Sequence, residues 1–199
     1  MGRAAKYTEA DILDAALGIV AEDGVHAATV VAIAHRLGAP SGSIYHRFAS
    51  RDLILAKLWI RTVRRFQEGF LAALNHPEPI RAARAAAAHT VNWTADHRSE
   101  ARLLVLYRRE DLIALWPEEL GDELATLNDK VRRAVLSCTR ACFGAVDAQS
   151  AGRVRFALID LPYAAARQVL ATDGPMAPWL ESALLTAVSA ILRAGGEDS

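Results

Sequence analysis

The sequence predicts an all-α protein of about nine helices, in which a small N-terminal three-helix domain precedes a larger helical domain. Three observations support this fold class. The periodic apolar stretches repeat every three or four residues, and no run of β-branched residues alternates with polar ones as a strand would. Most of the prolines and several glycines fall between these stretches. We place the domain boundary between residues 53 and 54.

Composition places the chain among globular proteins. The chain has 199 residues, of which 52% are hydrophobic and 23% are charged. The N-terminus has no continuous apolar run, and uncharged runs such as Ser182–Leu192 are too short to cross a bilayer. We therefore expect a cytoplasmic protein that is not inserted in a membrane.

The two cysteines, Cys138 and Cys142, stand four residues apart in a helical pattern. A metal site would need two more ligands nearby, and the neighbouring sequence offers none. We interpret the pair as small core residues, and we expect neither a metal nor another cofactor.

The first helix has a complete start signal. Thr8 is the expected N-cap, and Asp11 stands three residues later, where a capping-box acid belongs. An apolar stripe follows with helical spacing, and Gly24 is expected to end the helix.

Two short helices should follow, joined by the tight turn "LGAP". Thr29 can cap the second helix, which Gly38 ends. Pro40 suits the first turn of the third helix, which we extend to about Phe48. Two short helices joined by a glycine-containing turn are typical of a helix-turn-helix motif.

The later helices should be longer. Ser50 is the expected cap of the fourth helix, and Pro162 should interrupt a long helix near Leu158. The predicted ranges are residues 51–74, 79–97, 99–115, 117–143, 147–171 and 178–194.

The third helix should present an unusual outer face. If Ile44 and Phe48 anchor it to the core, small residues and hydrogen-bonding groups point outward. Small residues let a helix approach base edges in the major groove, while phenol, imidazole and guanidinium groups can hold phosphates. A solvated face on a helix bundle is the alternative interpretation. The outward positions are Gly42, Ser43, Tyr45, His46 and Arg47.

The charge distribution agrees with a polyanionic partner. The chain has no net charge, but residues 1–65 carry nine Lys or Arg against six Asp or Glu, a net charge of +3. Arg51, at the start of the next helix, adds a cation beside the outer face.

Residues 8–53 resemble the DNA-binding region of the TetR family of transcriptional regulators. The resemblance is carried by "ILDAAL" in the first helix and by "TVVAIAHRLGAPSGSIYHRFASRDLIL", with fixed spacings of Gly38, Gly42, Ser43, Ile44, Tyr45 and Phe48. Pro40 stands where this family often has a Ser or Thr cap, and Arg51 where lysine is usual.

The resemblance implies a homodimeric repressor that binds a palindromic operator in double-stranded DNA and is released by a small-molecule effector. By position, Ser41, Gly42 and Ser43 would approach base edges, and Arg47 could contact bases or phosphates. The expected phosphate ligands are Thr29, Tyr45, His46 and Arg51.

The same resemblance assigns the effector site and the dimer interface to the larger domain. Aromatic and polar residues are candidates for the effector site, although aromatic residues at helical spacing are more often core, and Asp160 could instead satisfy backbone freed by Pro162. The candidates are Trp59, Phe66, His89, Asn92, Trp93, Leu103, Tyr107, Trp116, Phe156 and Asp160.

The last two long helices, over residues 147–171 and 178–194, are the candidates for the dimer interface. Both carry apolar stripes, and the alanines of the final helix permit close approach of a second copy. Packing within the chain is the alternative explanation of the same apolar stripes. The candidate interface residues are Leu180, Ala183, Leu184, Ala187, Val188 and Ile191.

Other functional classes have less support. The sequence has no Ser-His-Asp, HExxH, phosphate-loop or GxGxxG pattern, so we do not expect an enzyme. A helical protein-interaction module, or an activator without a small-molecule ligand, stays open as the alternative.

Overall fold

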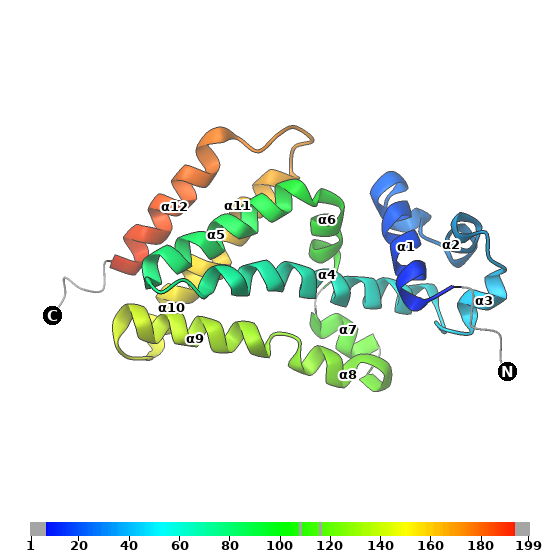
Figure 1. Ribbon diagram of the computed structural model, residues 1–199, viewed down its shortest axis with the longest axis horizontal. Coiled ribbons are helices and arrows are strands. Elements are labelled where there is room, and N and C mark those ends of the chain that lie inside the picture. Colours follow the sequence, from blue (N-terminus) through cyan, green and yellow to red (C-terminus); the bar gives the residue numbers. More distant parts are fainter. Residues whose placement is uncertain (1–6, 108, 116, 194–199) are drawn as a thin grey trace. The chain divides into compact units, whose positions relative to one another are not determined.

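The computed structural model describes residues 7–107, 109–115 and 117–193, and within them the regular structure is helical with no strand, which confirms the all-α prediction (Figure 1). The N-terminal elements are α1 (Glu9–Asp23), the 3-10 turn η1 (Val25–Ala27), α2 (Val30–Leu37), α3 (Ser41–Tyr45) and α4 (Arg51–Leu74). They are followed by α5 (Pro79–Asp96), α6 (Arg98–Leu106), α7 (Arg109–Leu115), α8 (Pro117–Thr126), α9 (Asp129–Phe143), α10 (Ala148–Arg155), α11 (Leu161–Leu170) and α12 (Pro178–Arg193).

The chain forms two compact units. Unit 1 contains Met1–Val63 and Ser99–Ala125, and unit 2 contains Arg64–Arg98 and Thr126–Ser199. Helix α4 contributes its first half to unit 1 and its second half to unit 2. The domain boundary that we place after residue 53 stays a prediction.

The start of α1 follows the predicted capping box. The Thr8 hydroxyl accepts a hydrogen bond from the Asp11 backbone N–H at 3.2 Å, and the Asp11 carboxylate accepts one from the Thr8 backbone N–H at 2.7 Å. The bonds that Thr8 donates lower the pKa of Asp11, because they favour its ionised form. The carboxylate therefore supports this cap at neutral pH.

The core of unit 1 fixes the short helices. Ile12 and Ala16 of α1, Ile33 of α2 and Ile44 of α3 are buried together with Phe48. Helices of five to eight residues are not stable alone in water, so α2 and α3 depend on this packing.

Two predicted long helices are divided in the structure, which corrects the sequence interpretation. The helix over 99–115 is broken after Leu106, where α6 ends. The helix over 117–143 is broken at Leu127 and Asn128, between α8 and α9. There the Asn128 side chain accepts a hydrogen bond from Gln67 Nε2 at 2.9 Å. This is a tertiary contact that the neighbouring sequence does not indicate.

The predicted interruption before Pro162 is confirmed. A π-helical segment, η2 (Phe156–Asp160), separates α10 from α11, and the Leu161 N–H bonds back to the Phe156 carbonyl. Proline has no N–H to donate to the Leu158 carbonyl, which explains why the regular α-helical backbone hydrogen bonds are interrupted here. Asp147 caps α10, the first helix of the predicted range 147–171.

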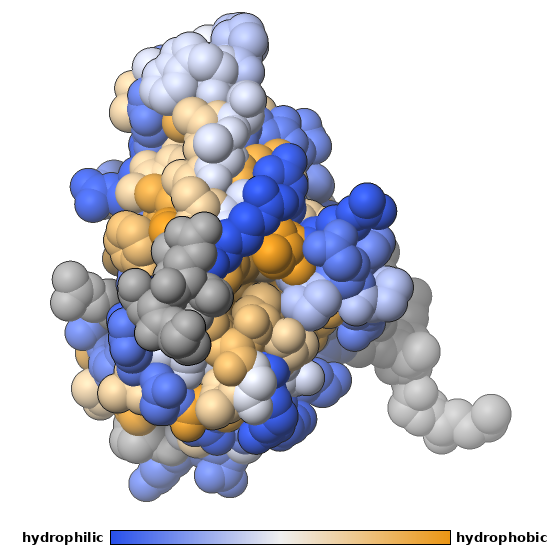
Figure 2. All heavy atoms as spheres, turned by 90° about the vertical axis from the view of Figure 1, so that its left-hand side faces the viewer, coloured by the Kyte–Doolittle hydropathy of each residue, from blue (hydrophilic) through white to orange (hydrophobic). Residues whose placement is uncertain are grey.

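In unit 2, α11 and α12 pack on α5, and α9 packs on α5 and α10. The buried faces of these helices form one apolar core that includes Ala83, Ala87, Leu158, Leu184 and Val188. Figure 2 shows the end of this unit, where apolar side chains lie between hydrophilic ones.

Among the described residues, no helix combines the length and apolarity that crossing a membrane requires.

Candidate nucleic-acid interface

The turn between α2 and α3 depends on Gly38. This residue has φ +62° and ψ +35°, a left-handed conformation that suits glycine, and its N–H bonds to the carbonyls of Ala34 and His35. Pro40, with φ −63°, then occupies the N-cap of α3 without a side-chain cap. The tight helix-turn-helix geometry predicted from "LGAP" is therefore present, with Pro40 one position earlier than we placed it.

Helix α3 is shorter than predicted. It ends at Tyr45, and a turn through His46 and Arg47 leads to Phe48, whose N–H still bonds to the Ile44 carbonyl at 3.0 Å. Ile44 and Phe48 are both buried, as expected for the two anchors of this segment.

The outward side of this segment is exposed at four of the five positions that the sequence indicated. Tyr45 is 55% exposed, and Gly42, His46 and Arg47 are exposed as well. A Cβ atom added at Gly42 would meet no atom within 4 Å, so the chain itself does not require glycine there. Ser41 and Ser43 are partly buried.

Tyr7 is a residue of this surface that the sequence interpretation missed. Its hydroxyl donates a hydrogen bond to the Gly38 carbonyl at 3.0 Å, and its own carbonyl accepts one from Arg47 Nε at 2.9 Å. The segment before α1 therefore connects the turn to the end of the recognition segment. Because Arg47 Nε is bound to the Tyr7 carbonyl, the positions that the Arg47 guanidinium can occupy are restricted.

Thr29 caps α2 by accepting a hydrogen bond from the Ala32 N–H at 3.1 Å. The residue is exposed. A hydroxyl that accepts one hydrogen bond can still donate its own hydrogen, so this cap is compatible with the phosphate contact that the resemblance implies.

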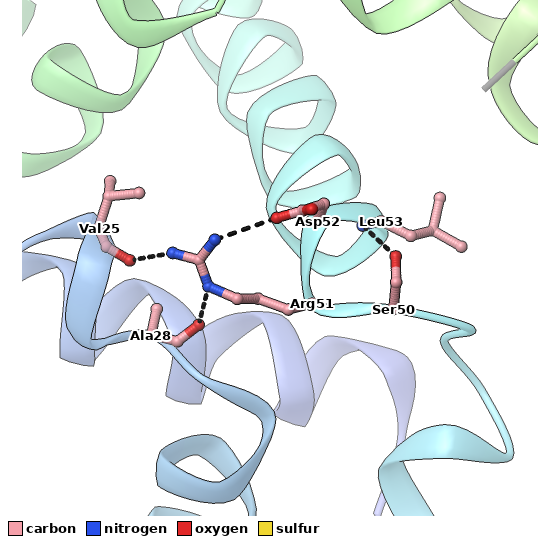
Figure 3. A network of polar contacts seen from close by, with 6 residues as sticks. All are labelled: Val25, Ala28, Ser50, Arg51, Asp52 and Leu53. Carbon is pink, nitrogen blue, oxygen red and sulfur yellow. Dashed lines mark hydrogen bonds and ion pairs between the residues drawn. The ribbon is translucent and has the colours of Figure 1, made fainter. Parts of the chain in front are cut away.

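Arg51 has a different environment from the one expected of a phosphate ligand. Its Nε donates to the Ala28 carbonyl at 3.0 Å, and a terminal nitrogen donates to the Val25 carbonyl at 2.6 Å (Figure 3). The other terminal nitrogen lies 3.0 Å from Asp52 Oδ1. Arg51 thus ties the start of α4 to the connection between α1 and α2, while Ser50 caps α4 through the Leu53 N–H.

We expect Arg51→Lys to destabilise the protein in the absence of DNA. One ammonium group cannot reproduce the guanidinium contacts to both carbonyls, so the free energy of unfolding should fall by about 1–3 kcal/mol. Chemical denaturation measures this change. The control is Arg140→Ala, at an exposed position of α9, which should change the free energy of unfolding by less than about 0.5 kcal/mol. Unchanged stability in the Lys variant would mean that Arg51 acts only through its charge.

Three of the candidate effector residues meet in unit 2. The ring centroid of Phe66 lies 5.2 Å from that of His89 and 5.4 Å from that of Trp93. His89 Nε2 lies 2.9 Å from the Phe66 carbonyl, and its ring fills the space above Gly69, where an added Cβ would overlap it. This cluster packs α5 against α4, with Trp93 buried in it.

Gly69→Ala should therefore lower the free energy of unfolding by about 1–3 kcal/mol, because the new methyl group forces His89 from its place. Adding His89→Ala in the same chain removes the overlap. A double-mutant cycle measured by chemical denaturation should give a coupling above about 0.5 kcal/mol, whereas additive effects would contradict the close packing.

The other effector candidates are divided between the two units. Trp59, Leu103 and the partly buried Tyr107 belong to unit 1, and burial raises the pKa of Tyr107. In unit 2, Asn92 donates to Glu181 at 3.4 Å, and the Asp160 carboxylate lies 3.6 Å from Arg155. Phe156 is half exposed, and Trp116 lies outside the described residues.

A cavity of about 420 Å³ in unit 2 was not anticipated. It lies between the second half of α4 and the start of α9, where Gln67 contributes to its wall. The charged residues that line it are Arg64, Glu68, Asp129, Lys130 and Arg133. Its volume is within the usual range of small-molecule sites, and its ionic lining suits a polar, charged compound.

The predicted dimer residues of α12 divide into two groups. Leu180, Leu184 and Val188 lie in the core of their own chain, with Leu184 only 4% exposed, so they are not available to a partner and that part of the prediction is wrong. Ala183 is exposed, and Ala187 and Ile191 are partly buried.

Large apolar side chains are instead exposed on other positions of unit 2. Phe156 is 49% exposed, Tyr163 is 50% exposed, and Ile159 lies exposed between them along η2 and α11. Trp179 is exposed at the start of α12. Such a set of exposed apolar residues is typical of a protein–protein contact surface.

The buried anchors, the left-handed turn and the exposed recognition segment are the features of a helix-turn-helix motif. Residues 12–58 match the family model described as "Bacterial regulatory proteins, tetR family". The N-terminal region of the chain is therefore similar to the DNA-binding region of this family of regulators.

Solved structures share this fold over nearly the whole chain. A transcriptional regulator from Rhodococcus sp. RHA1 is 18% identical with a TM-score of 0.67, covering 94% of this chain and 97% of its own. The ketosteroid transcriptional regulator KstR2 of Mycobacterium tuberculosis is 18% identical with a TM-score of 0.63, covering 96% and 97%.

The TetR-family regulator PfmR from Thermus thermophilus is 19% identical with a TM-score of 0.62, covering 92% of this chain and 97% of its own. A comparison with curated proteins found no match. At these identities the structural similarity establishes the fold alone.

Proposed function

We propose that the protein is a repressor that binds a palindromic operator as a homodimer and releases it when a small molecule binds. The observation that carries the DNA-binding part is the exposed face of α3, where Gly42 presents no side chain and Tyr45 is 55% exposed. Ser41, Gly42 and Ser43 would face base edges, while Thr29, Tyr45 and His46 would hold phosphates.

Arg51 has a second role in this proposal. Its side chain positions the start of α4 through the Val25 and Ala28 carbonyls, and its positive charge stays beside the recognition surface. Arg47 contributes charge from a place fixed by the Tyr7 carbonyl.

The homodimer is supported by the exposed apolar residues of η2, α11 and α12. Phe156, Ile159, Tyr163 and Trp179 would be covered by the same residues of a second copy around a two-fold axis. A dimer presents two recognition helices, which matches two half-sites about one DNA turn, or ~34 Å, apart.

Release by an effector is supported by the 420 Å³ cavity beside Gln67. A compound bound there would contact both α4 and α9, and its binding energy could favour a conformation that no longer fits the operator. The mixed charges of the lining suggest a compound with both polar and anionic groups.

DNA binding can be tested with fragments from upstream of the protein's own gene and from neighbouring promoters. We expect a specific complex with a palindromic footprint, and its affinity should fall by ~10³–10⁵ between 50 and 200 mM salt if the dimer contacts 6–10 phosphates. Absence of a sequence-preferring complex across the genome would contradict this function and favour a helical protein-interaction module.

Reporter transcription separates the remaining alternatives. A repressor lowers expression from the bound promoter, whereas an activator raises it. A metabolite screen that follows thermal stabilisation and DNA release together tests the effector, because an activator without a ligand would respond to no compound.

A further inference from the structure

The side chains of Cys138 and Cys142 face each other on α9, and they are the two cysteines of the chain. Their sulfur atoms lie 4.0 Å apart and share a hydrogen bond. Cys138 is 7% exposed, and Cys142 is partly buried beside it. The sequence suggested two small core residues. The structure adds that their two sulfur atoms are in contact.

This geometry does not suit a disulfide. Residues four apart on a helix have Cβ atoms about 5–6 Å apart, whereas a disulfide needs Cβ atoms about 3.5–4.5 Å apart and sulfurs about 2.05 Å apart. Helix α9 continues past both residues and closes with a bond from the Gly144 N–H to the Arg140 carbonyl at 2.8 Å. Joining the sulfurs would require the last turn of α9 to unwind.

A cavity of about 210 Å³ gives access to Cys138 from outside the core. Its walls are the turn between α4 and α5, including Asn75 and His76, and the α9 residues Ser137, Cys138 and Ala141. This cavity lies in unit 2, the unit whose end is shown in Figure 2 with apolar side chains between hydrophilic ones. A small ion can therefore reach Cys138 without opening the core.

The two thiols differ in their readiness to ionise. The hydrogen bond from Cys138 lowers the pKa of Cys142, whereas the same bond and burial raise the pKa of Cys138. A thiolate, rather than a thiol, is the form of cysteine that binds a metal.

We propose that Cys138 and Cys142 bind a soft univalent cation of the class of Cu(I) and Ag(I), held between the two sulfurs. With metal–sulfur bonds of about 2.3 Å, the observed spacing corresponds to a sulfur–metal–sulfur angle of about 120°, and a linear bridge needs the sulfurs only about 0.6 Å further apart. This site is independent of the proposed repressor function.

The coordination number selects the metal class. Among the described residues, no group of three or more His, Cys, Asp or Glu side chains could hold an ion, so a closed tetrahedral zinc site is not provided there. Thiolate sulfur is a soft ligand that selects Cu(I), and univalent coinage metals accept two such ligands. Binding releases the protons still held by the two thiols, and no electron is transferred.

The test is a titration of the full-length protein with Cu(I) under anaerobic conditions, against a coloured Cu(I) chelator. We expect one Cu(I) per chain to resist a chelator concentration that removes it from Cys138→Ser and from Cys142→Ser, with at least a tenfold loss of affinity in each. Ser137→Ala, which changes the same cavity but no sulfur, should retain the wild-type affinity.

Thermal unfolding without metal checks that the serine variants remain folded, and X-ray absorption of the loaded wild-type protein should show two sulfur neighbours. Retention of Cu(I) by either single variant, or a single sulfur neighbour, would overturn the two-sulfur site. Rapid formation of an intramolecular disulfide with peroxide while α9 keeps its helicity would overturn the geometric argument.

Discussion

Gly42→Leu should reduce operator affinity by about 100-fold or more while leaving the protein folded. The new side chain would project from the exposed face of α3 into the space that base edges would occupy, so the helix could not keep its contacts, each worth about 1–3 kcal/mol. The chain itself has room, since a Cβ at this position meets no atom within 4 Å. Stability should stay equal or rise by about 0.5–1 kcal/mol, because glycine is unfavourable within a helix.

The control is the same substitution at Gly121 in α8, where an added Cβ also meets open space. Fluorescence anisotropy with operator DNA and thermal unfolding, run on both variants, separate binding from folding. If Gly42→Leu binds DNA like the wild type, α3 does not enter the groove with this face.

The second large effect concerns assembly. The double variant Phe156→Asp, Tyr163→Asp should be monomeric in size-exclusion chromatography with light scattering, because two carboxylates per chain would be buried without partners in the proposed interface. Both side chains are about half exposed in the single chain, so the fold should survive. Operator affinity should fall by ~10²–10⁴, since the two half-sites are no longer bound by one linked molecule.

Two further variants make this result specific. Leu136→Asp changes a leucine that is also exposed, on α9, and should leave the dimer intact. Leu184→Asp changes a residue of the chain's own core and should unfold the protein rather than give a folded monomer. A dimer that persists in the double variant would move the interface away from η2 and α11.

Local signals predicted the N-terminal helices well because their determinants are close in sequence. Thr8 and Asp11 form a capping box, Thr29 caps α2, and Gly38 takes a left-handed conformation that glycine adopts more readily than other residues do. The breaks after Leu106 and at Asn128 were missed because neither involves proline or glycine. The latter coincides with a side-chain contact from Gln67, sixty-one residues away.

The spacing of the apolar residues on α12 does not show whether they face the chain's own core or a second copy. A stripe through Leu180, Leu184 and Val188 suits a chain's own core and an interface equally, and in this structure it faces the core. Phe156 was assigned to the effector site and Tyr163 was not singled out, for another reason. The π-helical turn between them shifts the helical register, so a regular helical wheel misplaces the residues of α11.

The Arg51 contacts have a consequence for reading alignments of related sequences. Its two carbonyl acceptors, on Val25 and Ala28, belong to the backbone and persist whatever side chains stand there. Arg51 can therefore be retained through evolution without any partner position that covaries with it. An invariant cation with no covarying partner beside a recognition helix resembles a nucleic-acid contact, although here it holds two main-chain segments together.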